Sequence, residues 1–190
     1  MTRMSILGRM LEPFSNTALS STNTLHTKAS AMAIQVRRVV TGHDDKGHAR
    51  IEIDEIAHNV VSPRAGHSST VVWSTQGFPV NNDGFEDPTQ SAFKSTVDNG
   101  TVFRVVRYEP GVAPRNHRTD SIDYAVVITG EIQMELDNGV VCALKAGDVL
   151  VQRGTIHNWV NLGPEVCIIA FVLISAKPVK SEGRSLAAVN

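Results

Sequence analysis

The sequence predicts an all-β protein folded as one antiparallel barrel, and three observations lead to this prediction. Short runs rich in β-branched residues recur between residues 34 and 176, several with strict alternation of apolar and polar residues, which is the period of a β-strand. Turn-forming residues such as Pro110-Gly111 separate these runs. No long stretch has helical periodicity, and a short helix is expected only between residues 87 and 97.

The expected strands are short and closely spaced. They cover residues 34–40, 49–53, 69–74, 101–108, 124–129, 131–136, 140–144, 148–151 and 166–175. Asn138-Gly139 lies between two of them and is the strongest hairpin signal in the chain, because the favoured hairpin turn needs two residues that tolerate positive φ. Many short strands separated by turns favour a barrel or a sandwich.

Three parts are expected along the 190 residues. Residues 1–33 are rich in serine and threonine and hold one acid, which is typical of a disordered leader or a transit-like segment; Met32 is an alternative natural start. Residues 34–176 form the barrel, which is long enough to be one domain with its own core. Residues 177–190 are predicted to be a flexible C-terminal tail.

Composition argues against several classes of partner. The net charge is −1, with 18 basic and 19 acidic residues, so we expect no nucleic-acid partner. No apolar run approaches the roughly 20 residues that cross a bilayer, so we expect no membrane association. Cys142 and Cys167 stand in apolar runs without a CxxC spacing, which predicts buried thiols in a reducing compartment. We therefore expect a cytoplasmic protein, or a mitochondrial one if the leader is a transit segment.

A first motif carries polar residues at fixed spacing. It places Gly111, His117, Thr119, Asp123 and Gly130 with five residues before the histidine, three before the aspartate and six before the last glycine. This spacing resembles the first motif of the cupin family, in which a second histidine and a glutamate stand at the third and fourth places. Thr119 and Asp123 are the departures from that pattern.

A second motif follows 16 residues after Gly130. It runs Gly147, four residues, Gln152-Arg153-Gly154, two residues, His157, three residues, Asn161. It is similar to the second cupin motif, except that it is one residue short after the glycine and has Gln152 in place of proline. The resemblance implies a cupin jelly-roll β-barrel with a single motif set, as in small bacterial and fungal members of the family.

The motif residues predict one interior site. His117 and Asp123 have the same parity, and alternate residues of a strand face the same side of a sheet. In a small closed barrel, the inward side holds a cavity for one small ligand. We predict that His117, Asp123 and His157 bind one divalent metal ion, for which iron, zinc and manganese are equally suitable.

Other residues are expected to complete the site. Asp123 and His157 are predicted to be catalytic. The expected substrate contacts are Arg115, Thr119, Tyr124, Gln152, Trp159 and Asn161. The histidines outside the motifs, His67 among them, are expected on the surface or in loops, and packing is the expected role of Trp73 and Phe103.

The resemblance implies an enzyme that acts on an organic acid or polyketide-like small molecule by metal-dependent decarboxylation, dehydration or isomerisation. A dioxygenase with non-haem iron is one alternative. A metal-free cupin that uses Asp123 or His157 for acid–base catalysis is another, and a non-catalytic ligand-binding cupin is a third. We also expect a homodimer, formed by strand exchange near residues 34–40.

Overall fold

The computed structural model describes residues 34–90 and 96–189. These residues form β-strands and two short 3₁₀ helices, and their strands pair antiparallel, so the predicted all-β class is confirmed. The predicted leader, residues 1–33, lies outside the described residues. Within the described ranges, no helix is long and apolar enough to span a membrane.

The described residues contain thirteen strands in chain order. They are β1 (Arg37–His43), β2 (Ala49–Ile56), β3 (Val61–Arg64), β4 (His67–Gln76), β5 (Gly100–Tyr108), β6 (Ser121–Thr129), β7 (Glu131–Leu136), β8 (Val141–Lys145), β9 (Val149–Arg153), β10 (His157–Val160), β11 (Cys167–Ser175), β12 (Val179–Ser181) and β13 (Arg184–Leu186). The 3₁₀ helices are η1 (Pro88–Gln90) and η2 (Asp137–Gly139).

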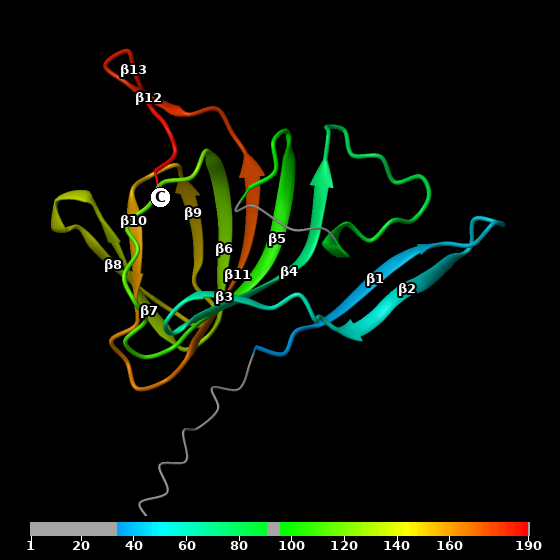
Figure 1. Ribbon diagram of the computed structural model, residues 1–190, viewed down its shortest axis with the longest axis horizontal. Helices are drawn as coiled ribbons and strands as arrows, with labels where there is room; N and C mark the ends of the chain where they lie inside the picture. Colours follow the sequence, from blue (N-terminus) through cyan, green and yellow to red (C-terminus); the bar gives the residue numbers. More distant parts are fainter. Residues whose placement is uncertain (1–33, 91–95, 190) are drawn as a thin grey trace, which may run out of the picture. The chain divides into compact units, whose positions relative to one another are not determined.

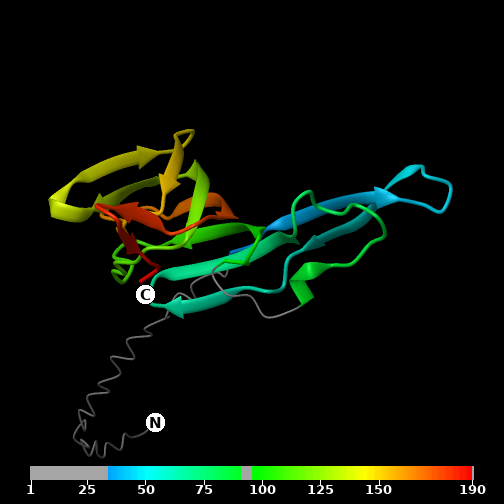
Figure 2. The same cartoon turned by 90° about the horizontal axis from the view of Figure 1, so that it is seen from above.

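Two sheets form the jelly-roll barrel (Figure 1). The larger has the order β3-β4-β5-β11-β6-β9, and the smaller has the order β10-β7-β8. Figure 2 shows β7 and β8, in yellow-green and yellow, as a layer across one end of the larger sheet. Both sheets contribute buried apolar residues to one core, including Met134 and Trp159 from the smaller sheet and Ile169 and Phe171 from the larger.

The alternation in the sequence matches the burial of the strands. Along β11 every second residue from Cys167 to Leu173 is buried, and along β6 the same holds from Ser121 to Val127. The hairpin signal is confirmed between β7 and β8, where Asn138 and Gly139 have φ of 58° and 74°. Positive φ at both positions is what an Asn-Gly hairpin turn supplies at low steric cost.

Other expectations need correction. The helix expected at residues 87–97 is reduced to η1, and residues 91–95 lie outside the described part. The segment expected as a flexible tail contains the β12–β13 hairpin, after which Val189 pairs with Arg118 through backbone bonds of 2.9 and 3.0 Å. Cys167 is buried as predicted, but Cys142 is exposed; it lies on β8, the edge strand of the smaller sheet.

Arg38 ties the β1–β2 hairpin to the segment around η1. Its guanidinium is 3% exposed and lies 2.6 Å from Glu55 and 2.5 Å from Asp87, with a further bond to Thr89 of 2.8 Å. The adjacent Arg37 points to the opposite side and pairs with Asp54 in solvent. These two arginines therefore make similar ion pairs in different surroundings.

The homodimer stays a prediction. Residues 37–40 pair with β2 of the same chain, and β1 has no second strand partner among the described residues, so its other edge is the one that could pair with another chain. We still expect twice the monomer mass of 20.6 kDa in static light scattering at micromolar concentration. A mass of one chain would contradict the prediction.

Candidate active site

The strand register brings polar residues together on the inner face of the larger sheet. Phe171 of β11 lies opposite Arg104 on one side and Ala125 on the other. Leu173, the next inward residue of β11, lies opposite Asp123. Arg104 and Asp123 therefore occupy neighbouring rows of the same face, separated by one strand.

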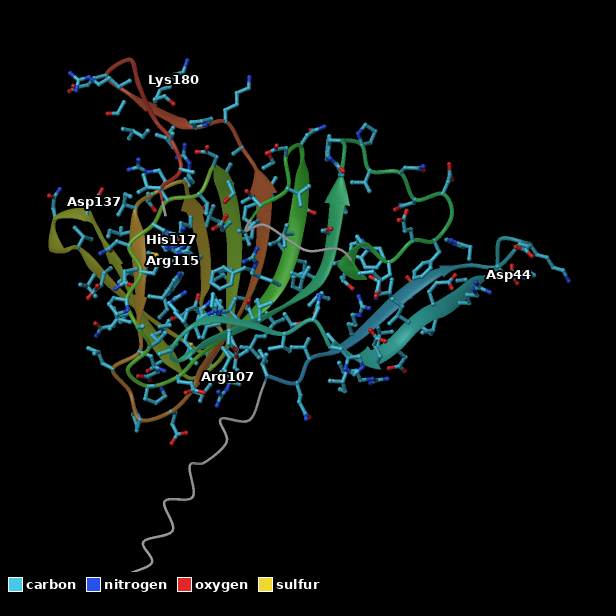
Figure 3. The ribbon with its side chains drawn as sticks, viewed as in Figure 1. Asp44, Arg107, Arg115, His117, Asp137 and Lys180 are labelled. Atoms are coloured by element: carbon cyan, nitrogen blue, oxygen red, sulfur yellow. The ribbon has the colours of Figure 1, made fainter. Side chains whose placement is uncertain are left out.

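A cavity of about 60 Å³ opens on this face. Six residues predicted for the site line it: Arg115, His117, Thr119, Asp123, His157 and Trp159. The other lining residues were not predicted for the site, and four of them carry polar groups: Arg64, His67, Arg104 and Tyr108. Figure 3 labels Arg115 and His117 beside β10, the strand that carries His157.

His117 and His157 form the centre of the cavity. Their backbones are paired by two hydrogen bonds of 3.0 Å, and their ring centres are 4.1 Å apart. Nδ1 of His117 lies 3.1 Å from the Arg115 carbonyl, and Nδ1 of His157 lies 3.0 Å from the Thr155 carbonyl. Because a carbonyl only accepts, each Nδ1 carries the proton of the neutral ring, and each Nε2 carries the lone pair.

Gln152 holds the ring of His157 from the larger sheet. It lies opposite Asp123 in the β6–β9 register, and its buried amide nitrogen is 2.9 Å from Nδ1 and 3.2 Å from Nε2 of His157. Gln152 was predicted to bind substrate, but it does not line the cavity. It positions a lining residue instead.

Asp123 is buried and joined to a short chain of hydroxyls. Ser121 Oγ lies 2.5 Å from the Asp123 carboxylate and 2.8 Å from Thr119 Oγ1. When Asp123 is ionised it only accepts, so Ser121 then donates to Asp123 and accepts from Thr119, whereas protonated Asp123 can itself donate. Burial raises the pKa of Asp123, against the Ser121 hydrogen bond and the positive charge of Arg104, which lower it.

The lining histidines are shifted in the opposite direction. Burial, with smaller contributions from the neighbouring His117 and Arg115, lowers the pKa of His157 to about 4. Burial also lowers the pKa of His117. The pKa of His67 is lowered to about 4 by burial and by the charges of Arg64, Arg104 and Arg115. All three imidazoles are therefore uncharged at neutral pH.

The comparisons with known proteins agree with this fold. A family model described as "Cupin domain" matches residues 104–174, the segment that carries both motifs. "Phomopsin biosynthesis cluster protein C'" of Diaporthe leptostromiformis is 35% identical over 161 residues, covering 80% of this chain and 85% of the relative. The chain belongs to the cupin family.

Two further matches place this cupin among its relatives. "Cupin-domain-containing oxidoreductase fogC" of Aspergillus ruber is 32% identical over 161 residues, covering 80% of the cupin and 78% of the relative. A solved structure of an uncharacterised Klebsiella pneumoniae protein with a double-stranded β-helix domain is 24% identical, covers 62% of the cupin and 84% of that chain, and has a TM-score of 0.44.

Two predicted substrate contacts of the cupin lie away from the cavity. Tyr124 is 52% exposed, because it follows the inward Asp123 in β6 and so faces the other side. Asn161 is buried beyond the end of β10 and holds a turn. Its amide donates to the carbonyls of Tyr108 and Glu165 and accepts from the Gly163 N–H at 3.0 Å.

Replacing Asn161 by alanine is expected to act on stability. The change leaves buried backbone groups of Tyr108 and Gly163 without partners, which costs about 2–3 kcal/mol of unfolding free energy. Urea unfolding of the Asn161→Ala cupin measures this loss. A fully stable variant with impaired ligand binding would instead support the role predicted from the sequence.

The expected position of His67 also needs correction, because this residue lines the cavity. It was expected on the surface, but it stands on β4 opposite Tyr108, with the two ring centres 5.5 Å apart. Its buried Nδ1 has no hydrogen-bond partner among the described residues. An unpaired buried nitrogen that lines a cavity is a natural contact for a ligand.

The predicted metal set is only partly assembled. His117 and His157 meet, but within residues 34–90 and 96–189 no three His, Cys, Asp or Glu side chains form a group that can hold a metal ion. Asp123 is one methylene shorter than the glutamate of the first cupin motif, and its carboxylate is bonded to Ser121. Arg104 and Arg115 also line the cavity, and their charges oppose a dication. The described residues therefore bring two of the three predicted ligands together, and the metal stays a prediction.

The low pKa of His157 predicts a pH-dependent stability. The unfolded chain binds a proton near its ordinary pKa of 6.5, whereas the folded site resists protonation down to about 4. The contribution of His157 is therefore present above pH 6.5 and is lost as the pH falls towards 4, by about 2 kcal/mol at pH 4.5.

Urea unfolding at pH 6.5 and 4.5 measures this loss. His67 acts in the same direction and Asp123 in the opposite one, so the comparison uses His157→Gln, which removes one contribution. We expect the variant to lose less stability between the two pH values than the wild type. Equal losses would contradict the assignment.

Proposed function

We propose that this cupin is an enzyme that transfers protons on a small organic acid or polyketide-like molecule, in the manner of an isomerase or dehydratase. One observation carries the proposal: two uncharged imidazoles and one buried carboxyl line the same small cavity. A proton-transfer enzyme needs a base and an acid within reach of one substrate.

The histidine pair supplies the base. With each Nδ1 held by a backbone carbonyl, each Nε2 carries the lone pair that can take a proton, and in His157 this lone pair also accepts from the Gln152 amide at 3.2 Å. The two rings are too close to be charged together, as the effect of His117 on the pKa of His157 indicates. The pair therefore takes up one proton, and His157 is the assigned base.

Asp123 supplies the acid. Burial raises the proton affinity of its carboxyl, whereas burial lowers that of the imidazoles, so the two affinities approach each other. A proton removed from carbon by His157 is then balanced by one given by Asp123 to a neighbouring carbon or a departing hydroxyl. The first outcome is isomerisation, and the second is loss of water.

The names of two relatives are compatible with this type of reaction. One is named for a phomopsin biosynthesis cluster and another is named an oxidoreductase. Moving a hydroxyl and a carbonyl between adjacent carbons oxidises one carbon and reduces the other, and it requires proton transfers alone. An intramolecular oxidation–reduction of this kind is compatible with both the site and the names of the relatives.

Deuterium exchange tests the proposal. The full-length cupin in D₂O is incubated with a panel of small α-hydroxy ketones and 2-keto acids, and ¹H NMR follows the loss of the C–H signal next to the carbonyl. We expect exchange above the buffer rate with at least one compound. Binding without exchange across the panel would favour a ligand-binding cupin.

A metal-dependent lyase or dioxygenase is the second candidate, and the histidine pair is the observation that favours it. Two imidazoles on one ion at a right angle have ring centres about 4.5 Å apart, close to the 4.1 Å found here. Elemental analysis after purification without chelator separates the candidates. One equivalent of iron, zinc or manganese would favour this second function.

A further inference from the structure

Three arginines from separate segments line the cavity. Arg64 comes from β3, Arg104 from β5, and Arg115 from the loop before His117. Asp123 is the one acidic residue among the lining residues. The lining carries three positive charges and at most one negative charge, because its histidines are neutral at pH 7.

The fold holds the guanidinium group of Arg64 and the backbone of Arg104 and Arg115 in place. Arg64 Nε donates to the Ala113 carbonyl at 2.9 Å, which fixes the plane of its head group. The backbone N–H of Arg115 donates to the buried Asn158 side chain at 2.8 Å, which fixes the loop. Arg104 is set by the register of β5 against β11. Fixed, planar guanidinium groups match the two oxygens of a carboxylate.

Burial increases the effect of these charges. Arg104 is partly buried within the strand, and taking it out of water lowers its pKa. The unpartnered Nδ1 of His67 lies in the same lining and adds a hydrogen-bonding position. The cavity therefore has both the charge and the polar groups for an anionic ligand.

We propose that the cavity binds its substrate as an anion, with a carboxylate or enolate seated by Arg64, Arg104 and Arg115. This inference rests on the proposed function and narrows its substrate class. A volume of about 60 Å³ holds about four to six water molecules, which suits an anionic head of similar size. The same arginines stabilise the negative charge that develops when His157 removes a proton from carbon.

Propionate and propionamide test the proposal, because they have the same shape and differ in charge. Thermal unfolding of the full-length cupin is followed against each compound at constant ionic strength. We expect propionate to raise the melting temperature in a saturable manner and propionamide to have no effect. Equal effects of the two compounds, or no effect of propionate up to 100 mM, would overturn the proposal.

Arginine variants locate the site. Arg104→Gln and Arg115→Gln are expected to weaken propionate binding at least tenfold each. Arg107→Gln is the matched control, because Arg107 lies on the opposite side of β5, pairs with Glu109 and does not line the cavity. Figure 3 shows Arg107 well apart from Arg115 and His117. An equal loss in the Arg107 variant would overturn the assignment.

The design separates this inference from the proposed function. Each variant is first compared with the wild type by melting temperature without ligand, and Arg115→Gln on the loop continues the test if Arg104→Gln does not fold. Binding is measured without turnover. If propionate binds but no compound exchanges above the buffer rate, the proposed function is wrong and the anion site stands. Exchange of neutral ketones without propionate binding would remove the anion site and leave the proposed function in place.

Discussion

Replacing His157 by glutamine is expected to lower the rate of deuterium exchange by about 10²- to 10⁴-fold, the usual contribution of a general base. Glutamine keeps a polar side chain of similar length but has no basic nitrogen. The backbone pairing of His157 with His117 does not depend on the side chain, so the barrel should persist. Exchange rates and melting temperatures at pH 7 measure the two effects separately.

His58→Gln is the control for this experiment. His58 is exposed and does not line the cavity, so its replacement should leave the exchange rate unchanged. A His157→Gln protein that folds and retains the wild-type rate would contradict the assignment of His157 as the base. In that case His117 would be the remaining imidazole of the pair.

Replacing Arg38 by alanine is expected to lower the unfolding free energy by about 3 kcal/mol. The change leaves Asp87 in a largely buried position without its main partner and removes a bond to the buried Thr89. Arg38 also holds the pKa of Asp87 well below its ordinary value, so the variant loses this stabilisation as well. Urea unfolding at pH 7 measures the change.

Arg37→Ala is the matched control. Arg37 is the neighbouring residue on the same strand and makes a similar two-bond pair with Asp54, but both side chains are exposed. Exposed ion pairs contribute little because water and salt screen them. We expect the Arg37 variant to unfold like the wild type. Equal losses in the two variants would show that burial is not what makes Arg38 important.

Local patterns were sufficient to predict the strands and part of the site. Alternation in β6 and β11, and the turn at Asn138-Gly139, follow rules that act over a few residues. The motif spacing located His117 and His157, and their backbone pairing places both at one cavity. These features depend on neighbours in the sequence, so the sequence alone reveals them.

The remaining site residues depend on register between distant strands. Arg64, His67 and Arg104 stand on β3, β4 and β5, and antiparallel pairing carries them to the motif residues. One signal was available, since Arg104 interrupts the apolar run of β5, and a charge inside such a strand calls for a partner or a ligand. The pairing of Arg104 with Phe171 of β11, which places it beside the motif residues, is between strands distant in the sequence, and no local rule predicts it.

Two errors have simpler causes. Tyr124 follows Asp123 in the same strand, and adjacent residues of a strand face opposite sides of the sheet, so the two cannot line the same cavity. Asn161 has the same parity as His157, but β10 ends at Val160, and alternation does not extend beyond a strand.

The central claim is that the cavity transfers protons with its own side chains. The most direct test is the exchange rate of the full-length cupin after treatment with chelator, with residual metal measured by elemental analysis. We predict that the rate of the metal-depleted protein equals that of the untreated protein and does not rise with added iron, zinc or manganese. A rate that falls with the metal content and returns with one of these ions would contradict the claim.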